Sequence, residues 1–507
     1  MPEYLAPGVF IEEIERGPRP IEGVSTSTAA FLGETERGPT WPRLVTSFNE
    51  FTRLYGNAAA EGDFMPYAVG GFFENGGRRA YVCRIAGEGA ATATLIAGGL
   101  RIEANGPGAS GNRIFVKLIE GTTKTGPEKK PVGFRLQVAY WQSLPGGAPP
   151  DPFVQADTLP RPTLVEDFDD LVWDNPLSPD FYEKRLQGGS KLVNVTTTGP
   201  LAAPPAADFA PLAGGADGAE PTVVQYKGAA DDSSKRSGLA ALDLDEFREV
   251  ALVYAPAAGN EVVKAVYEHC EQNRFRFAVI DSPQNWGDVG KIDPRSNWET
   301  AYAAYYYPWV ITADLQSGAR RKVPPGGYVL GLYARTDTER GVWKAPANDV
   351  LRGIFDLEYY VNTQAQETLN PRGVNAIRQF PGRGMRVWGA RTLSSNGLWK
   401  YVSVRRLFIF LEKSIYEGTQ WVVFEPNDER LWARVKDTIR LFLRSQWRAG
   451  ALMGATEDQA FTIVCDRSTM TQDDILNGRL ICEIGIAPVR PAEFVIFRIF
   501  QNTAESQ

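Results

Sequence analysis

Two positions in this 507-residue chain combine residue types that could perform catalysis. Asp281 and Ser282 end the apolar segment Phe277–Asp281, and α/β enzymes often place catalytic residues where a parallel strand ends. His269 precedes Cys270 on a predicted helix, and a Cys–His pair is a common nucleophilic arrangement. Side chains at i and i+1 on a helix point apart, so a partly exposed helix histidine is the favoured interpretation. An Asp after a strand often only caps the next turn.

A third candidate is the glycine-rich segment Gly106–Gly111, which matches the pattern GxGxxG. A dinucleotide site needs a strand before this pattern and a helix opening from it. The following residues 112–119 are strand-like, and Pro107 has no amide hydrogen to offer, so a glycine-rich turn is favoured. The pattern GxxxxGK[ST] is absent, because Gly290-Lys291 is followed by Ile292. The sequence therefore predicts no catalytic, cofactor-binding or metal-binding residues, and no cofactor.

The composition argues against most enzyme chemistry. A single histidine in the whole chain removes most hydrolase and metalloenzyme mechanisms, because histidine is the commonest metal ligand and general base near neutral pH. The four cysteines are scattered singly, which is unlike a zinc ribbon or a disulfide-stapled scaffold. We find neither a signal peptide nor an apolar run of membrane-spanning length, and we expect a soluble protein in a reducing compartment with no direct membrane insertion.

Hydrophobic patterning predicts alternating strands and helices on either side of a Pro-, Gly- and Ala-rich region. Val250–Tyr254, Glu261–Gln272 and Phe277–Asp281 form a strand–helix–strand unit, whose strands should be parallel. The other main predicted elements are the strands Ala29–Gly33, Ala80–Ile85 and Trp309–Asp314, and the helices Phe48–Tyr55 (with Ser47 as N-cap), Asn297–Tyr306, Val404–Glu417 and Arg430–Ala449.

We therefore predict a mixed α/β fold. It has a discontinuous α/β core with βαβ units, an inserted mostly-β outer domain, and extended N- and C-terminal β arms. The predicted divisions are an N-terminal β arm at 1–20, a first core segment at 21–90, the inserted peripheral domain at 91–236, an α/β middle domain at 237–370, a C-terminal core domain at 371–490 and a C-terminal β arm at 491–507.

The predicted helix near the C-terminus carries a basic face. The chain has a formal charge of -7, yet residues 371–450 are rich in Lys and Arg. At 100° per residue the apolar side chains lie opposite the basic ones. A solvated charged face and a contact with an acidic partner are equally good interpretations; nucleic acid is a lesser option, because no nucleic-acid motif accompanies the face. The basic residues are Arg430, Arg434, Lys436, Arg440, Arg444 and Arg448.

The two ends of the chain contain apolar, strand-like segments. A terminal strand with two apolar faces aggregates unless another strand pairs with it. Each could fold back into its own domain or add to the sheet of a neighbouring subunit, and repeated head-to-tail exchange would build a helical filament. The candidate pairing residues are Val9, Phe10, Ile11, Ile14, Phe494, Ile496, Phe497 and Ile499.

Several long segments resemble the tail sheath proteins of contractile phages and related contractile injection systems. Residues 91–236 match only loosely. The matching stretches are Ala6–Ile14 (APGVFIEEI), Gly23–Gly33 (GVSTSTAAFLG), Ala68–Arg79 (AVGGFFENGGRR), Trp298–Pro308 (WETAYAAYYYP), Val329–Asn348, Leu369–Arg406 (containing FPGRGMRVWGARTLSS), Gln420–Pro426 (QWVVFEP) and Ile484–Phe497 (IGIAPVRPAEFVIF).

The resemblance implies a structural, non-enzymatic subunit. Such subunits stack as hexameric rings around an inner tube, are joined by terminal arms and contract to drive the tube through a target envelope. It implies partners in further copies of the chain, the inner tube protein, and baseplate and terminal cap proteins, with the 371–490 domain facing the tube. It implies assembly in the bacterial cytoplasm and then a place in a virion tail or injection particle. An α/β enzyme with a site near Asp281 and a nucleic-acid coat protein remain the alternatives.

Overall fold

The computed structural model describes residues 20–58, 62–128, 130–144, 147, 149–154, 159–199, 201, 203–229 and 236–498. The chain divides into two compact units. The larger comprises the described residues of Ser25–Arg406 and Pro491–Gln507, and the smaller comprises those of Met1–Val24 and Leu407–Arg490.

A nine-stranded sheet forms the centre of the larger unit. Its strands are β1 Ala29–Gly33, β2 Arg43–Val45, β3 Ala80–Arg84, β13 Leu252–Tyr254, β14 Phe277–Asp281, β15 Ala303–Tyr307, β18 Asp349–Val350, β20 Val374–Phe380 and β21 Gly384–Val387. They lie in the order β18-β21-β20-β15-β14-β13-β1-β3-β2. The strands from β20 to β3 run parallel. The strands that flank this set, β21 and β2, pair antiparallel with it, and the edge strand β18 pairs antiparallel with β21.

The predicted discontinuous core is confirmed by the pairing of β1. This strand pairs in parallel with β3 on one side and with β13, which follows the inserted region, on the other. The register places Ala29 opposite both Ala80 and Leu252. The predicted βαβ unit of β13, α6 (Asn260–Asn273) and β14 is present, and its strands are parallel.

The predicted helix Asn297–Tyr306 is wrong. The chain there forms strand β15, whose five residues are all buried between β14 and β20. A short apolar run buried on both faces carries no period that separates helix from strand. The three tyrosines favour a strand, since aromatic residues pack well on a pleated surface.

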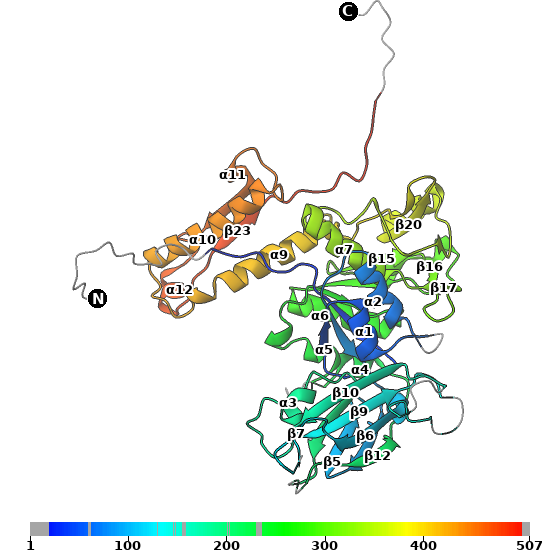
Figure 1. Ribbon diagram of the computed structural model, residues 1–507. Helices are drawn as coiled ribbons and strands as arrows, with labels where there is room; N and C mark the ends of the chain where they lie inside the picture. The colour runs from blue at the N-terminus through cyan, green and yellow to red at the C-terminus, as the bar shows by residue number, and fades with distance from the viewer. Residues whose placement is uncertain are drawn as a thin grey trace, which may run out of the picture. The chain divides into compact units, whose positions relative to one another are not determined.

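Helices cover both faces of the central sheet (Figure 1). Besides α6, the helices of the larger unit outside the inserted region include α1 Phe48–Tyr55 (with the predicted N-cap Ser47), α2 Met65–Glu74, α5 Gly238–Ala241, α7 Gly326–Arg340 and α8 Thr363–Leu369. On one face of the sheet, α6 buries Val263, Val266 and Cys270 against the strands. On the other, α2 and α7 pack close together, because a Cβ at Gly327 of α7 would come within 2.2 Å of the Ala68 carbonyl oxygen of α2.

A separate three-stranded antiparallel sheet also belongs to the larger unit. It consists of β16 Val310–Ala313, β17 Arg320–Val323 and β19 Asp356–Leu357, with β16 in the middle. Strand β16 corresponds to the predicted strand Trp309–Asp314.

The inserted region is mostly β-structure, as expected. Its elements are β4 Thr94–Ala97, β5 Leu100–Ala104, β6 Ile114–Glu120, β7 Lys124–Thr125, β8 Lys130–Pro131, β9 Phe134–Tyr140, β10 Leu164–Leu171, α3 Tyr182–Leu186, β11 Val193–Thr197, β12 Ala207–Pro211 and α4 Val223–Lys227. They form a four-stranded and a three-stranded sheet, both antiparallel, and the short pair of β7 and β8. Ile102 of β5, Val116 of β6 and Val138 of β9 are completely buried, so the region has a hydrophobic core of its own.

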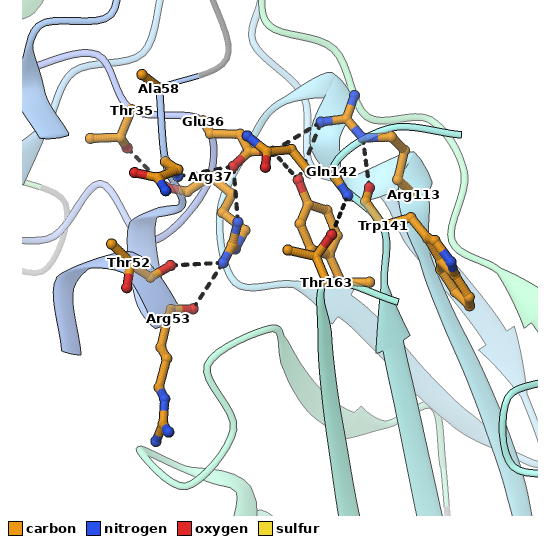
Figure 2. Close-up of polar contacts among 12 residues, drawn as sticks. Thr35, Glu36, Arg37, Thr52, Arg53, Ala58, Arg113, Trp141, Gln142 and Thr163 are labelled. Atoms are coloured by element: carbon orange, nitrogen blue, oxygen red, sulfur yellow. Dashed lines mark hydrogen bonds and ion pairs between the residues drawn. The ribbon is translucent and has the colours of Figure 1, made fainter. Parts of the chain in front are cut away.

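A buried carboxylate joins the inserted region to the loop that follows β1 (Figure 2). The side chain of Glu36 is 3% exposed, and its Oε2 lies 3.0 Å from Nη1 of Arg37. Its Oε1 accepts hydrogen bonds from Arg113, which directly precedes β6, and from Tyr140, at the end of β9. Burial and the neighbouring Glu36 carboxylate raise the pKa of Tyr140 to about 12. Two neighbouring strands of the insertion are therefore held at one charged group of the core.

The smaller unit is built on two long helices, α9 (Val402–Gly418) and α10 (Glu429–Arg448). The division between the two units falls inside α9, between Arg406 and Leu407. Phe410 of α9 and Phe442 of α10 pack with ring centroids 6.0 Å apart. Asp428 caps α10 by accepting a hydrogen bond of 2.8 Å from the Leu431 amide. The other elements are α11 Glu457–Ala460, β22 Phe461–Val464, α12 Gln472–Leu476 and β23 Glu483–Ile486.

The expected domain boundary at 371 differs from the division that the structure shows. Residues 374–387 contain β20 and β21, which belong to the nine-stranded sheet of the larger unit. The division falls instead between Arg406 and Leu407. A change of charge along the sequence marked residue 371, but backbone pairing with β15 assigns this segment to the sheet.

Candidate assembly surfaces

Asp281, the centre of the alternative enzyme hypothesis, is occupied by hydrogen bonds from its own chain. Its Oδ2 accepts from the Tyr254 hydroxyl at 2.6 Å and from the Ala257 amide at 3.1 Å. Its Oδ1 accepts from the amide of Gly326, the first residue of α7, at 2.8 Å. Burial raises the pKa of Asp281 to about 6. This geometry is that of a carboxylate that caps a helix and a turn.

His269 and Cys270 do not form a catalytic pair. Nε2 of His269 lies 2.7 Å from Nη1 of Arg276, so that ring nitrogen is the acceptor. Burial, together with the Arg276 charge, lowers the pKa of His269 to about 3. Cys270 is completely buried, and burial raises its pKa to about 12. Both side chains therefore contribute to the packing of α6.

The GxGxxG segment is a turn that leads into β6. A short 3-10 helix, Ala109–Arg113, overlaps its end, and β6 begins at Ile114. The Ala109 amide donates a 2.8 Å hydrogen bond to the Asp217 carboxylate, and Arg84 donates to the Pro107 carbonyl oxygen at 2.6 Å. The turn is thus occupied by groups of the same chain, in the arrangement expected of a structural loop.

Within the part of the chain that the structure describes, no cluster of three or more His, Cys, Asp or Glu side chains is placed to hold a metal ion. The helices in that same part include none with the length and apolar character needed to cross a membrane.

Helix α10 separates its side chains as the sequence predicted. Its buried residues are Leu431, Trp432, Val435, Thr438, Ile439, Phe442 and Leu443. The six basic residues lie on the remaining surface: Arg430, Arg434, Arg440 and Arg448 are exposed, and Lys436 and Arg444 are partly buried.

Acidic residues of the same unit neutralise part of this basic face. Arg444 lies 2.6 Å from Glu457, and Arg440 lies 3.4 Å from the same carboxylate. Arg434 lies 3.6 Å from Glu425 and 4.5 Å from the centre of the Trp421 ring. Among the described residues, no ion pair within 4.0 Å involves Arg430 or Arg448. The positive charge that remains for a partner is therefore carried by Arg430 and Arg448 at the two ends of α10 and by the partly buried Lys436 between them.

A second exposed feature lies between α9 and α10. Phe424 is fully exposed and has a left-handed φ of 67°, which is unusual for a bulky residue. Its neighbour Val423 is 60% exposed. Phe424 is not among the site residues predicted from the sequence, although the apolar segment QWVVFEP, placed between two helices, was a signal that could have identified it.

The C-terminal segment is anchored at one residue and exposed immediately after it. Glu493 accepts two hydrogen bonds from Arg391, at 2.7 and 2.8 Å, and one from Tyr401 at 3.0 Å. The next four side chains are apolar and exposed. They are Phe494 (71%), Val495 (67%), Ile496 (77%) and Phe497 (84%).

The smaller unit contains a short sheet with open edges. Strands β22 and β23 pair antiparallel, with Phe461 opposite Ile486 and Val464 opposite Glu483. Among the described residues no third strand joins this sheet. Open backbone groups along such edges are available to a strand from another chain.

The structure places three of the eight predicted arm residues, Phe494, Ile496 and Phe497, at the exposed segment. The other five predicted arm residues lie outside the described residues. They are Val9, Phe10, Ile11, Ile14 and Ile499.

The parallel core sheet, the inserted β-region and the helical C-terminal unit define the class of protein, and the comparisons agree. Residues 195–393 match the model of the phage tail sheath protein central domain, and residues 394–502 match that of the phage tail sheath C-terminal domain. Together the two matches cover more than half of the chain. The chain belongs to the contractile tail sheath protein family.

Among curated proteins, the chain is similar to a putative prophage major tail sheath protein of Pseudomonas aeruginosa (strain UCBPP-PA14). The two are 26% identical over 277 residues, which is 53% of this chain and 69% of the relative. It is also similar to the tail sheath protein of Vibrio phage KVP40, with 24% identity over 46% of this chain and 36% of the relative. With the phage protein the similarity thus spans about a third of the relative's length.

Solved structures match over nearly the whole chain. The helical sheath of the anti-feeding prophage in its contracted state is 25% identical, with a TM-score of 0.59, and the match covers 98% of this chain and 99% of that one. The sheath of the extracellular contractile injection system PVC, also in a contracted state, shares the fold at 24% identity, with a TM-score of 0.60 and 99% coverage of both chains.

Proposed function

We propose that this chain is the structural subunit of a contractile sheath. Copies polymerise as stacked hexameric rings around an inner tube, and the polymer contracts to drive the tube through a target envelope. Membership of the tail sheath family and the likeness to contracted sheaths support this proposal. A six-fold symmetrised baseplate of the anti-feeding prophage contains a chain that is 25% identical, which supports the hexameric ring.

The exposed C-terminal segment carries the proposal. Four consecutive apolar side chains follow Glu493 and face solvent in the isolated chain. Burying a Phe or Ile side chain contributes about 1.5–3 kcal/mol, so the segment gains stability when another subunit covers it. We expect Phe494, Ile496, Phe497 and Ile499 to add as a strand to a neighbouring subunit.

The β22–β23 sheet is the acceptor that this chain offers. Its strands are short and have edges without a partner among the described residues, so a strand from a neighbour would extend the backbone pairing. The N-terminal residues Val9, Phe10, Ile11 and Ile14 are proposed to join a neighbour in the same way. Each subunit then donates and accepts strands, and head-to-tail exchange of this kind builds a filament.

The basic face of α10 is proposed to contact an acidic inner tube. Arg430 and Arg448 have no ion pair within 4.0 Å among the described residues, whereas Arg434, Arg440 and Arg444 already lie near carboxylates. Arg430 and Arg448 therefore dominate the attraction, and Lys436 adds to it. Contacts of this kind weaken as the salt concentration rises.

Contraction is proposed to use energy stored in the assembled lattice. The sequence has no phosphate-binding GxxxxGK[ST] motif. One chain with two alternative packings can release energy when the subunits move from the less stable packing to the more stable one. The proposed further partners are baseplate and terminal cap proteins, with assembly in the bacterial cytoplasm and then a place in a virion tail or injection particle.

Electron microscopy of the purified full-length protein tests this proposal. We expect tubes or stacked rings with six-fold symmetry at high protein concentration. A protein that stays monomeric at all concentrations, both alone and with a co-expressed inner tube protein, would contradict the proposal. Enzymatic activity of the dilute monomer would favour the alternative α/β enzyme.

A further inference from the structure

Two cysteines that are separate in the sequence lie opposite each other in the smaller unit. Cys465 directly follows β22, and Cys482 directly precedes β23. The antiparallel register pairs Val464 with Glu483, and extending that register by one residue places Cys465 opposite Cys482. Both are free thiols, and each lies near enough to the other to shift its pKa.

This arrangement has the geometry of a disulfide. Directly opposite residues of an antiparallel pair have Cα atoms about 4.5–5.5 Å apart. A disulfide is formed at Cα separations of about 4.4–6.8 Å. The two sulfur atoms can therefore be joined without a large movement of the backbone.

The surroundings of the pair determine how it would react. Cys465 is buried, while Cys482 is half-buried and is the more exposed of the two residues. Burial raises the pKa of both thiols, that of Cys482 to about 12, and the nearby Lys436 ammonium acts in the opposite direction. The thiolate is the reactive form, so reaction is slow at neutral pH and faster in alkaline solution.

We propose that Cys465 and Cys482 form a disulfide when the protein meets an oxidising environment that supplies a low-molecular-weight disulfide. The Cys482 thiolate attacks one sulfur of that disulfide, forms a mixed disulfide and releases one small thiol. The Cys465 thiolate then attacks the Cys482 sulfur and releases the second small thiol. Two protein thiols are oxidised, and one small disulfide is reduced to two thiols.

The bridge closes the segment between β22 and β23, which contains α12 (Gln472–Leu476). It stabilises the short sheet by restricting the unfolded chain. Its formation does not depend on the proposed function. Only its consequence does, because that sheet is the proposed acceptor for strands of neighbouring subunits.

The test uses the native full-length protein, oxidised glutathione as the oxidant and a pH of about 8.5, the ordinary thiol pKa. The reaction is quenched with acid, the protein is denatured and alkylated, and its peptides are mapped by mass spectrometry. We expect a linked peptide pair containing Cys465 and Cys482, which disappears after reduction. Cys83 and Cys270 are both completely buried, so they should stay reduced during the oxidation and be recovered as alkylated, unlinked peptides.

A Cys465→Ser variant supplies the second readout. Without the resolving thiol, glutathione should remain attached to Cys482, whereas the wild-type protein should lose this adduct as the bridge forms. The proposal would be overturned if the wild-type protein kept glutathione attached to Cys482. It would also be overturned if Cys465 and Cys482 both stayed reduced in the native protein under conditions that oxidise the denatured chain. A failure to form tubes would leave this result unchanged, so the two proposals are tested separately.

Discussion

Arg391 and Glu493 are 102 residues apart in the sequence and form a two-point ion pair. Nε of Arg391 lies 2.7 Å from Oε1, and its Nη2 lies 2.8 Å from Oε2. Asn370 donates a further hydrogen bond of 2.9 Å to the same carboxylate. The pair holds the chain at the residue before the exposed apolar segment, so it sets where the proposed C-terminal arm leaves the larger unit.

Replacing Glu493 with Gln should loosen this anchor in a pH-dependent manner. Desolvation acts to raise the pKa of Glu493, but Arg391 and Asn370 outweigh it and lower that pKa to about 2. The stabilisation is therefore fully present above the ordinary pKa of 4.5 and is lost as the pH falls towards 2. The melting temperature of Glu493→Gln should be lower than that of wild type at pH 7, and the two melting temperatures should converge near pH 2. Glu417→Gln, which changes an exposed carboxylate of α9, is the control. A difference that persists at pH 2 would contradict the prediction.

Reversing the charges at the ends of α10 should weaken binding to an acidic inner tube. The double variant Arg430→Glu, Arg448→Glu changes two exposed side chains and should leave folding intact. We expect co-sedimentation with tubes to fall by at least about 10-fold at low salt, and the loss to shrink as salt screens the charges. The control is the double variant Arg53→Glu, Lys227→Glu, which makes the same change in net charge at exposed positions of the larger unit. Equal binding by wild type and the α10 variant would rule out this contact.

Polar substitutions in the C-terminal segment should separate assembly from folding. Phe494→Ser, Ile496→Ser and Phe497→Ser replace exposed side chains, so the melting temperature of the isolated chain should change little. Losing about 1.5–3 kcal/mol of burial per residue at an interface should abolish polymer formation at concentrations that suffice for wild type. Light scattering and electron microscopy provide the measurement. Unaltered tubes from the triple variant would show that the segment is not a connector.

Phe424 offers a test of a strained, exposed residue. A left-handed conformation costs a bulky residue about 1–3 kcal/mol, whereas Asn adopts it more readily. Phe424→Asn should therefore keep or raise the melting temperature, because the exposed ring makes no packing contribution. If the Phe424 ring packs against a neighbouring subunit in the assembly, Phe424→Asn should need about 10-fold more protein than wild type to polymerise. Leu398→Asn, at a position that is 61% exposed, is the matched control. A clear fall in the melting temperature of Phe424→Asn would show that the strain is not relieved.

The Glu36 junction should contribute strongly to the stability of the larger unit. Glu36→Ala leaves Arg37, Arg113 and Tyr140 without their shared carboxylate, and breaking a buried ion pair costs about 3–5 kcal/mol. Glu103→Ala removes a partner of Arg101 at the surface and should cost at most about 1 kcal/mol. Urea unfolding followed by tryptophan fluorescence compares the two variants. Equal midpoints would contradict the role assigned to Glu36.

Elements whose signals are local could be predicted from the amino-acid sequence. Ser47 and the residues after it predict α1 and its cap, and the spacing of the apolar residues of α10 predicts which face is buried. Such patterns depend on neighbours within one or two turns, so they are readable without the rest of the fold. The parallel pairing of β13 and β14 was also predictable from the sequence, because a helix that connects two strands of one sheet leaves them parallel.

Features that depend on distant partners emerge only from the folded chain. Ala303–Tyr307 is a strand because β14 and β20 enclose it, and its own pattern does not distinguish a strand from a helix. Glu457 reduces the free charge of α10 at Arg440 and Arg444, and a helical projection of α10 contains no information about that carboxylate. Cys465 meets Cys482 through the register of β22 and β23. In each case the physical reason is the same: long-range contacts add energy that local propensity does not report.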